Sequence, residues 1–345
     1  MCGVTGPFDI LAYGPRATLR EAAPPEWVPP MLATLTDKPF SDPGWAFERK
    51  FDGERCLAFR SRGELRLRSR SCRPLEGTYP EIADALRDQP LDDFVVDGEV
   101  VAFDGARTSF ALLQQRSGIK DPEVARMSSV RVFFYVFDLL YAQGRDATRL
   151  ALLDRKRVLR RALDFRDPVR YTVHRNCDGE RFFAQACTHG WEGLIAKETT
   201  SAYVPRRSSD WLKLKCSAGQ EFVVAGFTEP AGSRIGLGAL LVGYYDGQGD
   251  LVYAGKVGTG FDRATLVELG RRLKRLESTR PAFTPAPKVG RGVHWARPEL
   301  VVQVSFTEWT SEGKLRHPRF EGLREDKAAG EVHRENPRGR TVRGQ

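Results

Sequence analysis

The chain of 345 residues lacks the patterns that mark metal sites, disulfide frameworks and membrane spans. Its six cysteines include no Cys-x-x-Cys pair and have no histidines at metal-ligand spacing, which argues against a zinc site or a disulfide framework. No apolar run approaches the roughly 18 residues that a membrane-spanning helix needs. The first residues, MCGVTGPFDILAYG, have neither the basic nor the apolar region of a secretory leader. We therefore expect a soluble intracellular protein in a reducing compartment, with five of the cysteines as buried or half-buried thiols.

Acidic residues are fewer than basic residues in this chain. Lysine and arginine number 54 against 45 aspartates and glutamates, for a formal net charge of +9. This excess favours a polyanionic partner such as nucleic acid, although many basic proteins bind none. The length allows two domains, and an apolar content of 41% supplies a core for each.

Turn-rich stretches divide the chain. Residues 1–30 are rich in proline, alanine and glycine, and are expected to form an extended arm without its own core. In residues 31–217, short aromatic and β-branched runs alternate with helical patterns, which predicts an α+β domain of antiparallel sheets with flanking helices. The clearest helices are YPEIADALR, LLDRKRVLRRAL and GERFFAQACTHG, the last with Asp178 placed to cap it.

The small residues of KCSAGQ, 215–220, indicate a domain boundary. Three strands separated by glycine-containing turns follow, then a helix with apolar residues at helical spacing and a further strand. That helix carries Leu266, Leu269, Leu273 and Leu276. The pattern predicts a small β-barrel of the oligonucleotide-binding (OB) type over residues 220–329. The polar, basic residues 330–345 are expected to form a mobile tail.

Charged residues interrupt the apolar strands at positions where a hydrophobic core would be expected to contain apolar residues. FERKFDGERC, residues 47–56, places Lys50 beside Asp52 and Arg55, yet its Asp-Gly pair is also typical of a hairpin turn. FVVDGEVVAF, residues 94–103, carries Glu99, and its Asp-Gly pair could likewise form a hairpin turn. VFFYVFDLLY, residues 132–141, contains Phe137, and an aromatic stripe of this kind is more often core than a stacking platform.

Three further stretches lie downstream. GWEGLIAKE carries Glu192 and Lys197, which a surface ion pair could explain. In DWLKLKC, strand alternation puts Lys213 and Lys215 on one face about 7 Å apart, and an anion between them would relieve their repulsion. RHPRFEGLREDK, residues 316–327, could be a solvated basic face. The joint order of all six stretches is much less probable by chance than any one of them.

Taken in order, KFDGER, SRSCRPLEGTYPEI, DGEVVAF, FYVFD, EGLIAK, WLKLK and RFEGLREDK resemble the motifs of the covalent nucleotidyltransferase superfamily of ATP-dependent DNA ligases, RNA ligases and mRNA capping enzymes. The resemblance covers about residues 31–328. PPMLATL, HWARPELVVQVSFTEWT and LRHPRFEGLREDK are similar to bacterial ATP-dependent DNA ligases, including the ligase domain of end-joining enzymes and stand-alone relatives. It implies an adenylation domain followed by an OB-fold domain, ATP as AMP donor, Mg²⁺ or Mn²⁺, and nicked or broken duplex DNA as substrate.

The resemblance also assigns site residues. It implies that a lysine attacks the α-phosphate of ATP, that AMP then passes to a DNA 5'-phosphate, and that the 3'-hydroxyl displaces it. Catalysis is assigned to Lys50, Asp52, Arg55, Lys213, Lys215, Arg324, Asp326 and Lys327. Nucleotide contacts are assigned to Glu48, Lys50, Arg55, Arg70, Glu99, Phe137, Lys197, Lys213 and Lys215, and the metal to Glu99 and Glu192.

Several roles follow from this assignment. Lys50 attacks only when neutral, so we expect burial or nearby cations to lower its pKa. Phe137 is expected to stack on adenine, and Lys213 and Lys215 to hold the α-phosphate. Arg324 and its neighbours are expected to orient pyrophosphate when the domains close about the flexible junction. Ser71, where these enzymes often carry asparagine or glycine, leaves one local contact open.

We expect a minimal, monomeric two-domain ligase of DNA repair in the cytoplasm, at the nucleoid, with an end-binding protein or repair polymerase as candidate partner. We expect it to act without a large N-terminal DNA-binding domain. A capping guanylyltransferase or RNA ligase is the alternative within the superfamily, and nucleotide and acceptor choice discriminate it. The second alternative is a non-catalytic DNA-binding OB-fold protein, but this function would not explain the charged residues of the motifs.

Overall fold

The computed structural model describes residues 6–230, 235–290 and 292–335. The described residues up to Cys216 form an N-terminal unit, and those from Ser217 onward form a C-terminal unit. The division falls within residues 215–220, where small residues indicated a boundary. No helix in the described part of the chain is long and apolar enough to cross a membrane.

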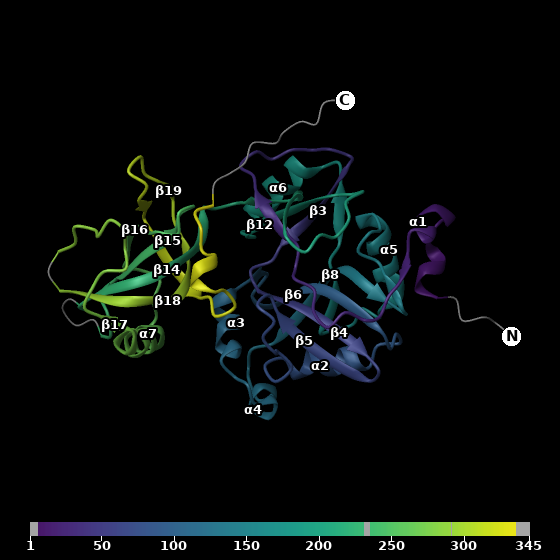
Figure 1. Ribbon diagram of the computed structural model, residues 1–345, viewed down its shortest axis with the longest axis horizontal. Helices are drawn as coiled ribbons and strands as arrows, with labels where there is room; N and C mark the ends of the chain where they lie inside the picture. The colour runs from purple at the N-terminus through teal and green to yellow at the C-terminus, as the bar shows by residue number, and fades with distance from the viewer. Residues whose placement is uncertain (1–5, 231–234, 291, 336–345) are drawn as a thin grey trace. The chain divides into compact units, whose positions relative to one another are not determined.

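An eight-stranded sheet forms the larger part of the N-terminal unit (Figure 1). Its strands, in spatial order, are β1 (Arg20–Glu21), β9 (Arg145–Asp146), β8 (Val132–Ala142), β6 (Phe94–Asp104), β4 (Glu54–Ser61) and β5 (Glu64–Ser69), with β10 (Val169–Tyr171) paired to β8 and β7 (Arg107–Thr108) to β6. All pairs are antiparallel except β10 with β8. Apolar side chains of α2 (Pro80–Arg87) and α5 (Leu152–Ala162) pack on this sheet in one core.

A five-stranded sheet forms the rest of the unit. Its order is β11 (His174–Asn176), β3 (Trp45–Lys50), β12 (Gly193–Glu198), β13 (Arg207–Lys215) and β2 (Leu32–Leu35). One face is apolar because Phe47, Leu194 and Leu214 pack with Phe182 of α6 (Gly179–Thr188). Strand alternation then directs the charged residues of β3, β12 and β13 to the opposite face.

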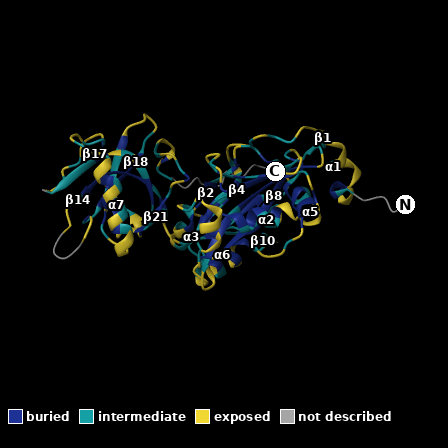
Figure 2. Cartoon of the chain, turned by 90° about the horizontal axis from the view of Figure 1, so that it is seen from below, coloured by how far each residue is buried: buried dark blue, intermediate teal, exposed yellow. Residues whose placement is uncertain are grey.

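The remaining helices of this unit are short. They are the 3₁₀-helix η1 (Pro7–Ile10), α1 (Tyr13–Ala17), α3 (Phe110–Ser117) and α4 (Pro122–Arg126). The outer sides of α6 and of α7 (Arg263–Arg275) in the C-terminal unit are exposed, whereas buried residues gather along the strands (Figure 2).

The C-terminal unit is a closed barrel. Its strands are β14 (Gly219–Thr228), β15 (Leu240–Tyr245), β16 (Leu251–Val257), β18 (Val293–Ser305) and β21 (Arg319–Leu323), with β17 (Glu277–Ser278) paired to β18. A parallel bridge between Thr259 and Arg319 returns β21 to the end of β16. Five strands closed in this order, with α7 (Arg263–Arg275) between the third and fourth, form an OB-fold. The hairpin β19 (Glu308–Trp309) and β20 (Leu315–Arg316) and the 3₁₀-helix η2 (Ala329–Glu331) complete the unit.

The α+β fold class, with an OB-fold C-terminal domain, is confirmed. The predicted helices appear as α2, α5 and α6, and the fourth is α7, with Leu266, Leu269 and Leu273 buried. Asp178 occupies the N-cap position of α6, but its side chain makes no capping hydrogen bond.

Neither Asp-Gly pair forms a hairpin. Asp52-Gly53 carries the chain from β3 in one sheet to β4 in the other. Gly98 lies inside the continuous strand β6, where a Cβ atom would lie 2.5 Å from the Phe134 ring. This glycine is therefore required by the close approach of β8 rather than by a turn.

The described residues of the arm and the tail, 6–30 and 330–335, are more ordered than predicted. Phe8 and Leu11, each 7% exposed, join the core beneath the eight-stranded sheet, and β1 pairs with β9. Val332 is fully buried, and its carbonyl accepts a hydrogen bond from the Tyr245 N–H. Apolar residues isolated in polar segments thus dock on cores formed elsewhere. Residues 1–5 and 336–345 lie outside the described residues.

The prediction of no disulfide is wrong. Cys187 of α6 and Cys216 at the end of β13 form a disulfide, with Cα atoms 5.2 Å apart. Packing of α6 on β13 brings together residues separated by 29 positions, which no local spacing reveals. Cys56 is buried as expected, but Cys72 and Cys177 are exposed, and Cys2 lies outside the described residues.

Replacing Cys187 with serine should lower the free energy of unfolding of the N-terminal unit by about 2–4 kcal/mol, because the disulfide closes a long loop in the unfolded chain. Urea unfolding without reductant measures this effect. Dithiothreitol should destabilise the wild type similarly and the variant much less. Cys177→Ser, at an exposed free thiol, is the matched control. Equal stability of wild type and Cys187→Ser would contradict the prediction.

Candidate active site

Three neighbouring strands place Lys50, Gly193 and Lys215 in one row. Gly193 of β12 lies opposite Lys50 of β3 and opposite Lys215 of β13. Residues directly opposite one another share a face, so the two lysines flank the glycine. The φ of Gly193 is +147°, and a Cβ atom there would lie 1.9 Å from the Leu214 carbonyl oxygen. The central strand therefore puts no side chain between the two lysines.

A second row lies beside the first on the same face. Glu48, Ile195 and Lys213 are opposite one another on the same three strands. Leu212 and Leu214 are buried on the other face. The prediction that Lys213 and Lys215 share one face is confirmed. Ile195, which the sequence analysis did not single out, is the apolar member of this row.

Lys50 is held by a carboxylate. Its Nζ forms an ion pair with Glu192 Oε1, and the two side chains are 18% and 24% exposed. Burial lowers the pKa of Lys50, but Glu192 and, more weakly, Asp52 and Glu99 more than reverse this, so its pKa is raised. The expectation of a lowered pKa is wrong for this state. Lys50 must lose a proton before it can attack, and Glu192 is the base in contact with it.

Asp52 ties the segment after Lys50 to α3. Its Oδ2 accepts a hydrogen bond from the Phe110 N–H at 3.1 Å, and its own N–H donates to Thr108 Oγ1 at 3.1 Å. A carboxylate at a helix N-terminus is favourable because the free N–H groups there carry partial positive charge. Asp52 thus fixes the course of the chain between Lys50 and Arg55.

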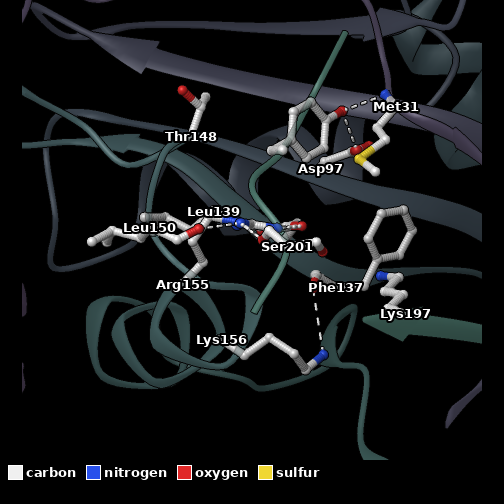
Figure 3. A network of polar contacts seen from close by, with 12 residues as sticks. Met31, Asp97, Phe137, Leu139, Thr148, Leu150, Arg155, Lys156, Lys197 and Ser201 are labelled. Carbon is white, nitrogen blue, oxygen red and sulfur yellow. Dashed lines mark hydrogen bonds and ion pairs between the residues drawn. The ribbon is translucent and has the colours of Figure 1, made fainter. Parts of the chain in front are cut away.

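Arg55 is anchored by a buried network that starts at Asp97. Its Nε and Nη2 donate to the two Asp97 carboxylate oxygens, each at 2.5 Å. The Tyr203 hydroxyl donates to Asp97 Oδ2 at 2.7 Å and accepts from the Met31 N–H at 2.9 Å (Figure 3). Burial alone would lower the pKa of Arg55, but the ion pair with Asp97 more than reverses this, so the pKa of Arg55 is raised. Asp97 lies within one of the charged stretches, yet its role as this anchor was not predicted.

Glu48 is buried between two lysines. Its Oε1 lies 2.5 Å from Lys156 Nζ, and its Oε2 lies 2.7 Å from Lys197 Nζ. Burial raises the pKa of Glu48, but the lysines reverse this and lower it below its usual value. Burial also lowers the pKa of Lys197 to about 8. The surface ion pair considered for Lys197 is therefore excluded.

Two residues of α5 that the sequence analysis missed support β8. Arg155, fully buried, binds both oxygens of Asp138, and Lys156 donates to the Phe137 carbonyl at 3.4 Å. Arg155 lies three residues and Lys156 four residues after the buried Leu152, on the side of α5 that faces the core. Charged residues at these spacings are the signal that could have found them.

Phe137 lies between the sheets. Its ring is 4.8 Å from the Arg55 guanidinium carbon and 4.2 Å from Lys197 Nζ. It makes an edge contact with Trp211 and is 8% exposed. Its stacking on adenine stays a prediction. Arg70 follows β5 and is half-buried, and its contact with a nucleotide also stays a prediction.

Carboxylates gather near Lys50. Glu192 Oε2 is buried and has no hydrogen-bond partner within the described structure. Glu99 lies opposite Arg55 in the β4–β6 pair and is close enough to raise the pKa of Lys50. No group of three or more histidine, cysteine, aspartate or glutamate residues among those described could hold a metal ion by itself.

The remaining predicted residues lie in the C-terminal unit. Arg324 donates to both oxygens of Asp326, through Nε at 2.9 Å and Nη2 at 2.8 Å. Lys327 Nζ is 3.0 Å from Glu221 Oε2 on β14. Their role in the reaction at Lys50 stays a prediction.

A row of half-buried lysines with a carboxylate partner, followed along the chain by an OB-fold, is typical of a covalent nucleotidyltransferase. The family model "ATP dependent DNA ligase domain" matches residues 30–215, and "ATP dependent DNA ligase C terminal region" matches residues 233–327. The chain belongs to the ATP-dependent DNA ligase family.

The chain is similar to the ligase portion of longer proteins. It is 39% identical over 322 residues to the multifunctional non-homologous end joining protein LigD of Pseudomonas aeruginosa, covering 91% of this chain and 37% of that protein. With LigD of Mycobacterium tuberculosis H37Rv the identity is 38% over 314 residues, or 89% and 40% of the two chains. The solved structure of mycobacterial DNA ligase D complexed with ATP and MES is 36% identical, with a TM-score of 0.64 over 89% of this chain and 98% of that one.

Proposed function

We propose that this protein is an ATP-dependent DNA ligase that joins 5'-phosphate and 3'-hydroxyl ends through a lysyl-AMP and a DNA-adenylate. The observation that carries the proposal is the row in which Lys50 and Lys215 flank Gly193, with Glu192 in contact with the Lys50 amine. Family membership supports it.

The geometry supports a defined first step. Glu192 accepts a proton from Lys50, and the neutral amine attacks the α-phosphorus of ATP. A nitrogen–phosphorus bond forms, the bond to the bridging oxygen breaks, and pyrophosphate leaves. Lys215 and Lys213 neutralise the phosphate, because phosphoryl transfer is chiefly positioning and charge stabilisation.

The base of the nucleotide is proposed to lie beyond the phosphate along β3. Glu48, two residues before Lys50 on the same face, borders this region, and Ile195 offers an apolar surface from β12. Phe137 of β8 approaches from the other sheet, because its ring lies 4.2 Å from Lys197 Nζ. An apolar side chain and an aromatic ring are suited to the two faces of a purine.

The carboxylates present fit a Mg²⁺ or Mn²⁺ ion. Glu192 Oε2 is buried without a hydrogen-bond partner in the described structure, and Glu99 adds a second carboxylate. Mg²⁺ in phosphate-transferring enzymes is commonly bound by one or two carboxylates together with substrate phosphates. When bound, the ion would neutralise the phosphate oxygens. Glu99 and Glu192 are the residues proposed to hold it.

The proposed substrate is nicked or broken duplex DNA. The net charge of +9 supports it, and binding should weaken as salt rises because phosphate contacts release counterions. The printed names of the LigD relatives favour repair of double-strand breaks. The proposal includes a monomer acting on cytoplasmic, nucleoid DNA, with an end-binding protein or repair polymerase as its partner.

The test is incubation with magnesium and ATP labelled at the α-phosphate, after pyrophosphate treatment to remove any AMP already attached. A labelled protein band and sealing of nicked, gapped and broken duplexes are expected. No labelled band would overturn the proposal. Transfer from GTP to an RNA 5'-diphosphate would indicate a capping enzyme instead.

Arg324→Ala should slow self-adenylation on the order of 100-fold, as expected when a charged donor to a phosphate is removed. Sealing of a pre-adenylated nick should fall much less, because pyrophosphate departs only in the first step. Single-turnover rates of the two reactions measure the difference. Arg316→Ala, an exposed arginine paired with Glu308, is the control. Equal losses in both assays would contradict the assigned role.

A further inference from the structure

Lys156 of α5 is a buried lysine that the proposed reaction leaves without a role. Its side chain is 1% exposed, and its Nζ lies 2.5 Å from Glu48 Oε1. It also donates to the Thr172 carbonyl at 3.0 Å and the Phe137 carbonyl at 3.4 Å. These contacts use the three donors of an ammonium group. Because a buried charge is costly unless paired, the position is built around these partners.

Two of these partners lie where the proposed function puts the base. Glu48 shares a face of β3 with Lys50 and precedes it by two residues. Figure 3 shows Lys156 directed from α5 at the Phe137 carbonyl, with Lys197 beside the Phe137 ring. Lys197 Nζ holds the other oxygen of Glu48 at 2.7 Å. Lys156 therefore connects the carboxylate and the ring that border one region between the sheets.

The groups around Glu48 keep it ionised. Lys156 from α5, Lys197 from β12 and His174 from β11 face it. Tyr171 of β10 also interacts with Glu48 and Lys156, and Asp138 of β8 acts on Lys197. Burial would otherwise raise the pKa of Glu48. An ionised carboxylate accepts hydrogen bonds and cannot donate them. The 6-amino group of adenine is a donor, whereas the 6-oxo group of guanine is an acceptor.

We propose that Lys156 is a positioning residue for base selection. It holds the Glu48 carboxylate and the Phe137 backbone in one arrangement, so that the site takes a purine with a 6-amino group in preference to one with a 6-oxo group or none. This inference rests on the proposed function, because it requires Lys50 to accept the nucleotide. A site built to bind a polar substrate group rejects analogues that lack it.

The test compares self-nucleotidylation of wild type and Lys156→Met with ATP, GTP and purine riboside triphosphate, which lacks a 6-substituent. In the variant we expect a higher KM for ATP and an ATP preference over purine riboside triphosphate that is lower on the order of tenfold, the value of one charge-assisted hydrogen bond. Arg157→Met is the matched control, because the neighbouring Arg157 is 63% exposed and pairs only with Asp154 among the described ion pairs. It should leave both KM and preference unchanged.

The pH profile supplies a second readout. Without Lys156, the pKa of Glu48 rises, so the carboxylate is protonated at low pH and recovers its charge as the pH increases. Below about pH 8, where Lys197 keeps its charge, the ATP preference of Lys156→Met should therefore improve with rising pH, while that of the wild type stays flat. A role confined to packing would produce no such dependence.

The outcomes separate this inference from the proposed function. A wild-type protein that forms no covalent nucleotide adduct would overturn the proposed function. A labelled wild type combined with equal losses for all three nucleotides in Lys156→Met would overturn only the inference. Should Lys156→Met not fold, Lys156→Gln, whose amide still donates to the two carbonyls, carries the same expectation, and an unchanged ATP preference there would overturn the inference.

Discussion

Replacing Lys50 with arginine will abolish covalent transfer of AMP to the protein without disturbing the fold. Arginine keeps the positive charge that pairs with Glu192, so the half-buried carboxylate stays compensated. A guanidinium remains protonated in proteins and has no lone pair for attack. Self-adenylation should fall on the order of 10⁶-fold, to the detection limit, as it does when other covalent enzymes lose their nucleophile.

Two measurements make this result specific. Labelled ATP reports on adenylation, and mass spectrometry of the wild-type adduct should place AMP on the peptide that contains Lys50. Sealing of a pre-adenylated nick should be retained to a much larger extent in Lys50→Arg, because the final step uses the DNA 3'-hydroxyl as nucleophile. Lys38→Arg, at an exposed lysine of the same unit, is the control. Labelling that survives in Lys50→Arg would reassign the nucleophile, with Lys213 or Lys215 as the next candidates.

The raised pKa of Lys50 bears on how this reaction starts. Glu192 stabilises the ammonium form before ATP binds, which the sequence did not predict. Local pattern identified the lysine, because its neighbours Asp52 and Arg55 belong to one motif. It could not identify the partner, because Glu192 reaches Lys50 only through the antiparallel register of β3 and β12. Charge near a site depends on such register, which a single sequence does not specify.

Other parts of the site show the same division between local and tertiary information. Alternation along β13 placed Lys213 and Lys215 on one face, because the period of a strand is a local property. The burial of Lys156 was not predicted, because it depends on the packing of α5 against Glu48 of a distant strand. The Cys187–Cys216 disulfide was missed because it joins a helix to a strand 29 residues away.

The turn interpretation of the Asp-Gly pairs failed for a physical reason. Asp-Gly is favoured in two-residue hairpins, but glycine also serves where another backbone or ring comes close. At Gly53 a Cβ atom would lie 2.2 Å from the Val100 carbonyl oxygen, and at Gly98 it would meet the Phe134 ring. Such close approaches are tertiary and leave no distinguishing mark in the sequence.

Removing one partner of the Arg55–Asp97 pair will destabilise the N-terminal unit by about 3–5 kcal/mol. Asp97 is fully buried, and its carboxylate receives two bonds from Arg55 and one from Tyr203. In Arg55→Met the Tyr203 hydroxyl remains, but the negative charge is left uncompensated in the interior. In Asp97→Leu the positive charge of the Arg55 guanidinium is likewise left uncompensated. Urea unfolding of the N-terminal unit measures both losses.

The double variant tests the explanation. In Arg55→Met/Asp97→Leu no buried charge is left without a partner, so its loss of stability should be clearly smaller than the sum of the two single losses. Arg16→Ala breaks an ion pair of similar length, 2.6 Å, whose side chains are 54% and 31% exposed, and should change stability by no more than about 1 kcal/mol. Additive losses in the double variant would show that packing, rather than the buried charge, determines the cost.

In the same variants, self-adenylation should not recover together with stability. The double variant recovers stability but still lacks the guanidinium that lies 4.8 Å from the Phe137 ring and that is assigned to the nucleotide. Its self-adenylation should therefore stay as low as that of Arg55→Met, although more of the protein is folded. If activity returned together with stability, Arg55 would serve the fold alone. The Asp97 anchor would then hold Tyr203 and Met31 against the eight-stranded sheet without preparing a site for the nucleotide.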